Sequence, residues 1–175
     1  MKNSLWVFMG LAGLTWACSS PVAPVEEDLT QYVNPFIGTD FTGNTYPGAQ
    51  VPFGMVQLSP DNGLPGWDRI AGYYYPDSTI AGFSHTHLSG TGAGDLYDIS
   101  FMPVTHPVKE APAPLGIHSL FSHNDEAASA GYYRVLLKDY NINVELTATE
   151  RCGIQKYTFP KADASVYLKI GRAHV

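Results

Sequence analysis

The chain has 175 residues, of which 45% are hydrophobic and 15% are charged, so it has enough apolar material for one core and hardly for two. Its formal net charge is -6, and Lys and Arg form no cluster, which excludes nucleic acid as a partner because phosphate binding needs a basic surface. With 17 Gly, 13 Pro and 13% aromatic residues, the composition favours short strands joined by turns.

The chain begins with a predicted secretory signal over residues 1–18. Lys2 precedes an apolar run over 5–17 that ends in small residues before Cys18. This run is too short to span a bilayer. The residues LTWAC that end at Cys18 resemble a bacterial lipobox, with Thr15 and Trp16 as departures from it. We expect an exported outer-membrane lipoprotein or periplasmic protein, held at the membrane by a lipid on Cys18, with simple secretion as the alternative.

Residues 19–30 are rich in proline and acidic side chains and predict a flexible tether. We expect one domain over 31–169. The last six residues, IGRAHV at 170–175, can be translated from one frame of a common sequencing adapter, so we expect an artefact there and a truncated domain before it.

The coarse pattern after the tether is that of strands. Segments rich in Val, Ile, Tyr, Phe or Thr and bounded by Gly, Pro, Asn or Asp occur at 51–58, 71–75, 80–85, 98–104, 132–138, 143–149, 154–159 and 165–169. Within 132–138, apolar and polar residues alternate as in a strand with one wet face. Only 124–130 predicts a helical turn, capped by Asn124 or Asp125. The predicted fold is therefore an all-β antiparallel sandwich.

Cysteine chemistry is limited to Cys18 and Cys152. With Cys18 assigned to the signal, neither a disulfide nor a cysteine zinc site can form within the chain. We expect Cys152 to be a small buried apolar residue rather than a functional thiol.

A candidate polar ligand site is the segment GFSHTHLSGTGAGD at 82–95. If His85 and His87 lie on a strand, both rings project from one face, and Asp95 or another histidine could complete a zinc site. We favour hydroxyl binding or structural hydrogen bonds over metal, because no further metal motif accompanies them. Ser84 and Ser89 lie on no nucleophile elbow, so the segment lacks a catalytic set.

Two further polar features precede this segment. Asn34, Asp40 and Asn44 can bind sugar hydroxyls through paired donors and acceptors, although capping of turns is the simpler interpretation. Trp67 follows a Pro-Gly turn. Its flat face suits stacking on a sugar ring, and the alternative is that it folds back into the core.

Four segments carry a resemblance to a known family: YVNPFIGT, GNTYPGAQVPFGMVQLSPD, GYYYPDSTIAGFSHTHLSGTGAGD and ELTATERCGIQKYTF. Together they resemble the N-terminal domain of glycoside hydrolase family 92, calcium-dependent exo-α-mannosidases abundant in gut Bacteroidetes. The resemblance covers Tyr32 to Phe159, and Ala130 departs from it where proline is usual. It implies a galactose-mutarotase-like β-sandwich followed by a helical linker and an (α/α)6 barrel, and hydrolysis with inversion between two separated carboxyl groups.

The resemblance also implies what this chain lacks. In the family the general acid, the general base and most calcium contacts belong to the barrel, so we expect no catalytic residue here, and calcium only in the complete enzyme. It places Trp67 beside the sugar on the leaving-group side. It makes His85, His87 and Asp95 candidates for hydroxyl contacts or interdomain hydrogen bonds, with Asn44 and Ser84 as further candidates.

We therefore expect an inactive accessory domain whose catalytic barrel is missing. The complete enzyme would be an exo-α-mannosidase that acts on mannose-containing glycans, either N-glycans or mannan. The alternatives are a stand-alone, non-catalytic carbohydrate-binding module and a purely structural sandwich. A sandwich cut short also exposes a sheet edge and an apolar face, so we expect the fragment to aggregate or express poorly.

Overall fold

The computed structural model describes residues 27–90, 92, 96–106, 116–160 and 164–170. The predicted signal, Cys18, most of the tether and Asp95 lie outside these residues. Within them, the elements in chain order are η1 (Leu29–Tyr32), β1 (Ala49–Gln50), β2 (Gln57–Asp61), η2 (Trp67–Arg69), β3 (Thr79–Ile80), β4 (Gly82–Ser84), β5 (Ile99–Val104), β6 (Ser119–Leu120), η3 (His123–Asp125), β7 (Glu126–Ser129), β8 (Tyr132–Leu137), β9 (Ile142–Ala148), β10 (Gly153–Thr158) and β11 (Ser165–Ile170), the η elements being 3-10 turns.

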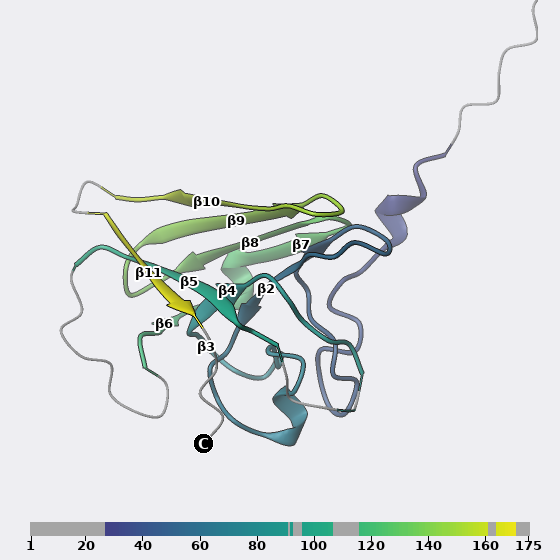
Figure 1. Ribbon diagram of the computed structural model, residues 1–175, viewed down its shortest axis with the longest axis horizontal. Helices are drawn as coiled ribbons and strands as arrows, with labels where there is room; N and C mark the ends of the chain where they lie inside the picture. The colour runs from purple at the N-terminus through teal and green to yellow at the C-terminus, as the bar shows by residue number, and fades with distance from the viewer. Residues whose placement is uncertain (1–26, 91, 93–95, 107–115, 161–163, 171–175) are drawn as a thin grey trace, which may run out of the picture.

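The strands form two main sheets packed face to face (Figure 1). One has five strands in the order β1-β2-β4-β5-β11, and the other has four in the order β10-β9-β8-β7. A small third sheet pairs β3 with β6. Every pairing among the described strands is antiparallel, which confirms the predicted all-β sandwich.

The core lies between the four-stranded sheet and the strands β1, β2, β4 and β5 of the other main sheet. In β8, Tyr133, Val135 and Leu137 are buried, whereas Arg134 between them is exposed, as the alternating pattern predicted. The register places these three opposite Leu146, Val144 and Ile142 of β9, which are buried as well. Apolar side chains that face each other across the two strands therefore form one wall of the core.

The predicted strand at 71–75 is wrong, because these residues form a turn-rich loop. Ala71 and Tyr73 are fully buried there, so their apolar character reflects burial and not strand pairing. The predicted strand at 80–85 is divided, since Thr79–Ile80 pairs with β6 and Gly82–Ser84 pairs with β2 and β5. Side-chain composition cannot show such a change of partner.

The predicted helical turn at 124–130 is shorter and lies earlier than expected. It covers only η3, and its cap is Ser122, whose Oγ accepts from the backbone N–H of Asn124. Residues from Glu126 onward continue as β7 instead. Cys152 is exposed, contrary to its predicted burial, because it lies in the turn between β9 and β10, where its carbonyl accepts from the N–H of Thr149.

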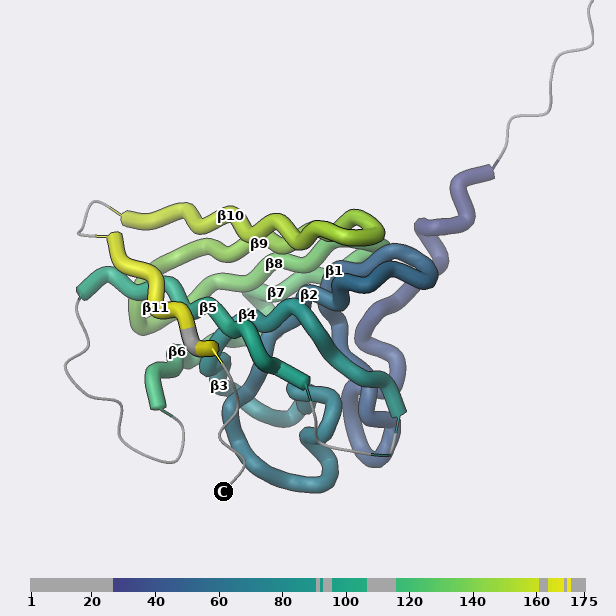
Figure 2. The backbone as a smooth tube through the Cα atoms, viewed as in Figure 1, coloured from purple at the N-terminus to yellow at the C-terminus, as the bar shows by residue number. Residues whose placement is uncertain are grey.

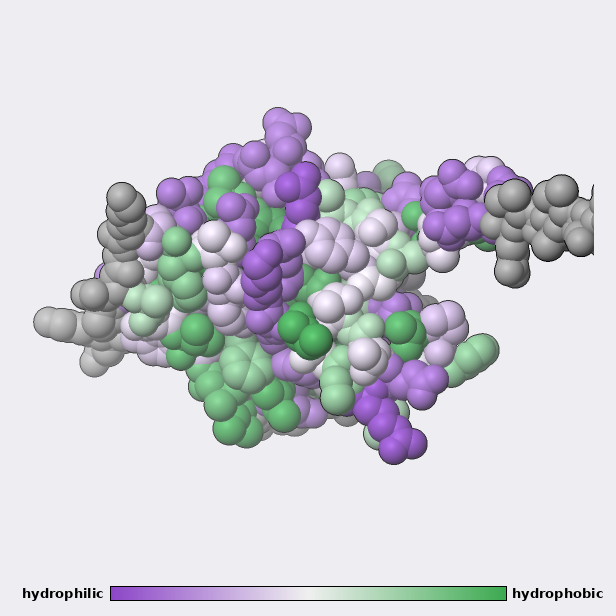
Figure 3. All heavy atoms as spheres, turned by 90° about the horizontal axis from the view of Figure 1, so that it is seen from above, coloured by the Kyte–Doolittle hydropathy of each residue, from purple (hydrophilic) through white to green (hydrophobic). Residues whose placement is uncertain are grey.

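One side of the sandwich is open, between β10 and β11. Figure 2 traces the chain from β10, at the edge of the four-stranded sheet, to β11, at the edge of the five-stranded sheet. Apolar side chains of β11 are exposed here: Val166 by 45%, Leu168 by 52% and Ile170 by 74%. Seen from above, hydrophobic side chains gather on the side of the molecule that carries β11 (Figure 3). We call this open side the mouth.

Candidate functional site

The buried centre of the 82–95 segment is His87. Its ring is fully covered, with Nδ1 2.7 Å from the backbone oxygen of Gln57 and Nε2 2.9 Å from Asp61 Oδ1. Ser84 Oγ lies 3.2 Å from the same Nε2. A carbonyl oxygen only accepts, so Nδ1 carries a proton and donates it. Both ring nitrogens therefore have partners inside the protein.

Ser84, His87 and Asp61 contain the residue types of a hydrolytic triad without its arrangement. In a triad the carboxylate holds one imidazole nitrogen and the other receives the serine proton. Here serine and carboxylate approach the same nitrogen, and Ser84 is completely buried. This cluster has no nucleophile that a substrate can reach, so its geometry fits structural hydrogen bonding, one of the interpretations left open for His87.

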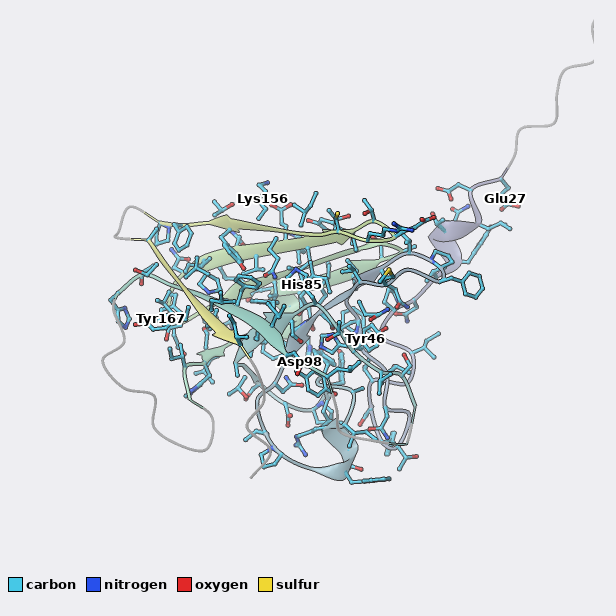
Figure 4. All side chains as sticks on the ribbon, viewed as in Figure 1. Glu27, Tyr46, His85, Asp98, Lys156 and Tyr167 are labelled. Atoms are coloured by element: carbon cyan, nitrogen blue, oxygen red, sulfur yellow. The ribbon has the colours of Figure 1, made fainter. Side chains whose placement is uncertain are left out.

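His85 lies in different surroundings, because β4 ends at Ser84 and the two histidines do not share a strand. Its ring packs edge-to-face on Phe101, with centroids 5.5 Å apart, and its Nδ1 is buried without a hydrogen-bond partner. Figure 4 shows His85 between β10 and the five-stranded sheet. The expected arrangement with both rings on one face is therefore wrong. Among the described residues, no group of three or more His, Cys, Asp or Glu side chains gathers to hold a metal.

His85 borders a cavity of about 310 Å³ at the mouth. Its lining comes from β5, β10, β11 and the end of β4, namely His85, Phe101, Gly153, Gln155, Tyr157 and Val166. The Nε2 amide of Gln155 is buried there without a partner, like Nδ1 of His85. Burial also raises the pKa of the Tyr157 phenol.

Trp67 lies at the start of η2 and is 61% exposed, so the interpretation that it fills the core is wrong. It belongs to the segment 62–79, which runs from the end of β2 to the first residue of β3 and which we call the Trp67 platform. The two ends of this loop are joined directly: the amide Nδ2 of Asn62 donates to the Thr79 carbonyl at 2.7 Å, and Thr79 Oγ1 donates to the Asn62 carbonyl at 3.3 Å. A large aromatic face is thus presented to solvent from a closed loop.

Asn44 is nearly fully buried and has a left-handed backbone with φ 50°. Its Nδ2 donates to the Thr42 carbonyl at 3.3 Å, and its Oδ1 has no partner. The N–H of Gly90 donates to the Asn44 carbonyl at 2.7 Å. Asn44 is therefore tied to the 82–95 segment, as Ser84 is tied to His87, while Asp95 lies outside the described residues.

A second buried network escaped the sequence analysis. Glu126, at the start of β7, accepts from Tyr133 Oη at 2.6 Å, from Tyr73 Oη at 3.0 Å, and from Nδ1 of His123, which lies 2.6 Å away. Burial and the Glu126 carboxylate raise the pKa of both tyrosines. Nε2 of His123 faces the Tyr75 carbonyl at 2.8 Å. This Glu126 network joins the Trp67 platform to the four-stranded sheet. Only His123 and Glu126 have a local spacing, three residues apart. The tyrosines come from a loop and from β8, so the sequence does not signal the whole network.

Comparison with known proteins places the chain in a family. It matches the Glycosyl hydrolase family 92 N-terminal domain over residues 32–174, and it therefore belongs to that family. Within the match, Ile170 of β11 is paired with Ile99 of β5. That 170–175 is a sequencing artefact stays a prediction.

Solved structures and a curated protein are similar to this chain and support its place in the family. A family GH92 alpha-mannosidase from Bacteroides thetaiotaomicron, solved in complex with mannoimidazole, is 47% identical with a TM-score of 0.77, covering 81% of this chain and 20% of that one. A family GH92 inverting mannosidase from the same species is 32% identical with a TM-score of 0.64, covering 79% of this chain and 19% of that one. An uncharacterized secreted glycosidase of Arthroderma benhamiae is 27% identical, covering 94% of this chain and 22% of that protein. The chain thus spans about a fifth of the length of these relatives.

Proposed function

We propose that this chain is the N-terminal sandwich of a longer inverting exo-α-mannosidase and forms one wall of its mannose pocket. The observation that carries the proposal is the 47% identity to an alpha-mannosidase solved with mannoimidazole. The substrates would be mannose-containing glycans, from N-glycans or mannan. The general acid and base of an inverting glycosidase are two carboxyl groups, and the family resemblance implies that both would come from a barrel domain outside these residues.

Trp67 is the residue of this chain that we assign to the sugar. An exposed indole offers a flat apolar face to the C–H face of a pyranose and one N–H donor at its edge. Its position on a closed loop supports this role, because a backbone that is already ordered loses less freedom when the sugar binds. His85, Asn44 and Asp95 remain proposed contacts to sugar hydroxyls or to the barrel. His87 and Ser84 would act through the structure they hold.

The family resemblance implies calcium in the complete enzyme. Calcium takes about six to eight oxygen ligands, and the described residues bring no acidic cluster together that fits it. Following the family resemblance, we assign most of the calcium contacts to the barrel domain of the longer enzyme, and we derive no step of this chain through the ion.

Export is the proposed destination, with a lipid on Cys18 as the membrane attachment. A relative named as a secreted glycosidase supports export. Within the described part of the chain, no helix is long and apolar enough to cross a membrane. Retention of labelled palmitate by the wild-type protein, and its loss in Cys18→Ser, would support the anchor. An unlabelled wild-type protein would contradict it.

The decisive experiment reads the gene beyond residue 175 and assays the longer product on α-mannosides, following the released anomer by NMR. We expect mannose release with inversion from the longer protein, and none from residues 1–175. Hydrolysis by the short chain, or retention of configuration, would overturn the proposal.

The exposed Trp67 also favours a second candidate, a stand-alone carbohydrate-binding module. A genuine stop codon directly after the sandwich, together with mannoside binding by the short chain in calorimetry, would support that candidate instead.

A further inference from the structure

The Trp67 platform is held by more contacts than closing a loop requires. Asn62, which is fully buried, donates its backbone N–H to the Gly72 carbonyl at 2.8 Å, and its Oδ1 accepts from the N–H of Tyr74 at 2.5 Å. Together with its bonds to Thr79, one side chain therefore fixes the loop at its ends and in its middle. Such a hub leaves few conformations open to the residues between.

Arg69 and Asp77 clamp the outer part of the platform. The guanidinium donates through Nε to Asp77 Oδ2 at 2.7 Å and through Nη2 to Asp77 Oδ1 at 2.5 Å, a bidentate pair. Its Cζ also lies 4.7 Å from the centroid of the Tyr74 ring. The hydrogen bond to Asp77 raises the pKa of Arg69, so the guanidinium keeps its charge. Because Arg69 is in the same 3-10 turn as Trp67, the clamp fixes the backbone that carries the indole.

The Trp67 platform packs against the cluster of Ser84, His87 and Asp61, which we call the His87 cluster. A Cβ placed on Gly72, whose φ is +86°, would lie 2.7 Å from Asp61 Oδ1 and 3.0 Å from Cδ2 of His87. Tyr97 donates its hydroxyl to the carbonyl of Ile70, two residues before Gly72. The buried histidine thus supports the loop from below, which links the 82–95 segment to Trp67.

We propose that Arg69 and Asp77 are positioning residues that hold the Trp67 ring ready for a sugar, with the His87 cluster as their floor. The proposal rests on the function assigned to Trp67 above. Its physical content is preorganisation: a loop already ordered before binding does not lose that freedom when the sugar arrives. Neither Arg69 nor Asp77 needs to touch the sugar.

The first test measures the indole alone. Trp67 is the only tryptophan left when residues 1–18 are removed, so time-resolved fluorescence anisotropy, measured below the concentration at which light scattering begins, reports on this ring. We expect the order parameter of the indole to be lower in Arg69→Lys, which keeps the charge but loses the fork, than in the wild type. Asp77→Asn provides a second variant of nearly unchanged size. The matched control is Lys156→Met, which removes a 2.6 Å ion pair to Glu145 and should leave the indole unchanged.

The second test uses the longer mannosidase. Arg69→Lys should raise KM by roughly 2- to 10-fold, the loss expected when a side chain must be ordered on binding, and leave kcat nearly unchanged. In a Trp67→Ala background the same substitution should have no further effect on KM, because the clamp acts only through the indole. Melting temperatures of the variants would be compared to detect a general loss of folding.

The outcomes separate the two proposals. A mobile indole in the wild type, an order parameter that Arg69→Lys does not change, or an equal KM increase with and without Trp67 would overturn the positioning role. If Trp67→Ala leaves kcat/KM unchanged, the sugar-stacking function fails. The anisotropy experiment then still decides whether the clamp fixes the loop.

Discussion

The Glu126 network offers a prediction that two neighbouring tyrosines of β8 can test. Tyr133 is fully buried and its hydroxyl donates to Glu126, whereas Tyr132 is half-buried and donates at 2.8 Å to Glu145, whose side chain is 32% exposed. Removing either hydroxyl with phenylalanine deletes one hydrogen bond to a carboxylate. The two variants therefore differ mainly in the burial of that bond.

We expect Tyr133→Phe to lower the free energy of unfolding by about 2 kcal/mol, within the range for a hydrogen bond to a charged group. The loss stays moderate because Glu126 Oε1 still accepts from Tyr73 and Oε2 still faces His123. For a domain of this size, 2 kcal/mol lowers Tm by roughly 4–8 °C. Tyr132→Phe should change the free energy of unfolding by less than about 0.5 kcal/mol, as surface substitutions usually do.

Equilibrium urea unfolding at low protein concentration, followed by circular dichroism, measures both variants. Similar losses in the two would show that burial does not strengthen the bond to Glu126. A Tyr133→Phe change below about 0.5 kcal/mol would refute the reasoning altogether, because a buried bond to a carboxylate should exceed that.

Three further predictions follow from the described contacts. The pKa of Tyr73 and of Tyr133 is raised in the folded chain, so above the ordinary value of 10.0 the unfolded chain releases these protons while the folded chain keeps them. The free energy of unfolding should therefore be full below pH 10 and fall above it. Urea unfolding between pH 9 and 11 should show a shallower fall in Tyr133→Phe, and equal slopes would contradict this. Gly72→Ala should lower the free energy of unfolding by about 2–5 kcal/mol, through a left-handed φ and a close approach to Asp61; an unchanged urea midpoint would show that the platform shifts freely. The chain should aggregate through the exposed apolar side chains of the mouth. Leu168→Thr should therefore raise the concentration at which light scattering begins, whereas Ile154→Thr, on the outer face of β10, should not. A soluble wild-type monomer that melts cooperatively would contradict this.

The sequence predicts the long strands well and the short ones poorly. Alternation in Tyr132–Leu137 and Ile142–Ala148 comes from a sheet with one buried face, and that periodicity can be seen in the residues themselves. The loop at 71–75 has the same residue types, but Tyr73 is buried by the network it joins and not by strand pairing. Only the fold reveals which cause applies.

The candidate site was predicted as a set of residues but not as a geometry. The composition of the motif at 82–95 predicts a polar site but not its geometry. β4 ends at Ser84, and His85 then lines the mouth while His87 lies beneath the platform. Asp61, Arg69 and Asp77 were not singled out because their partners lie in other segments or across an irregular loop. An acidic or basic residue in such a loop resembles any solvated charge until its partner is known.

The exposure of Cys152 allows a distance within the chain to be measured by resonance energy transfer. With residues 1–18 removed, Trp67 and Cys152 are the only residues of their kinds. The tryptophan lies in the loop after β2 of the five-stranded sheet, and the cysteine lies in the turn between β9 and β10 of the four-stranded sheet. A dye on the exposed thiol can therefore accept energy from the indole without further mutation. The efficiency of that transfer would report how the Trp67 platform and the turn between β9 and β10 separate during unfolding.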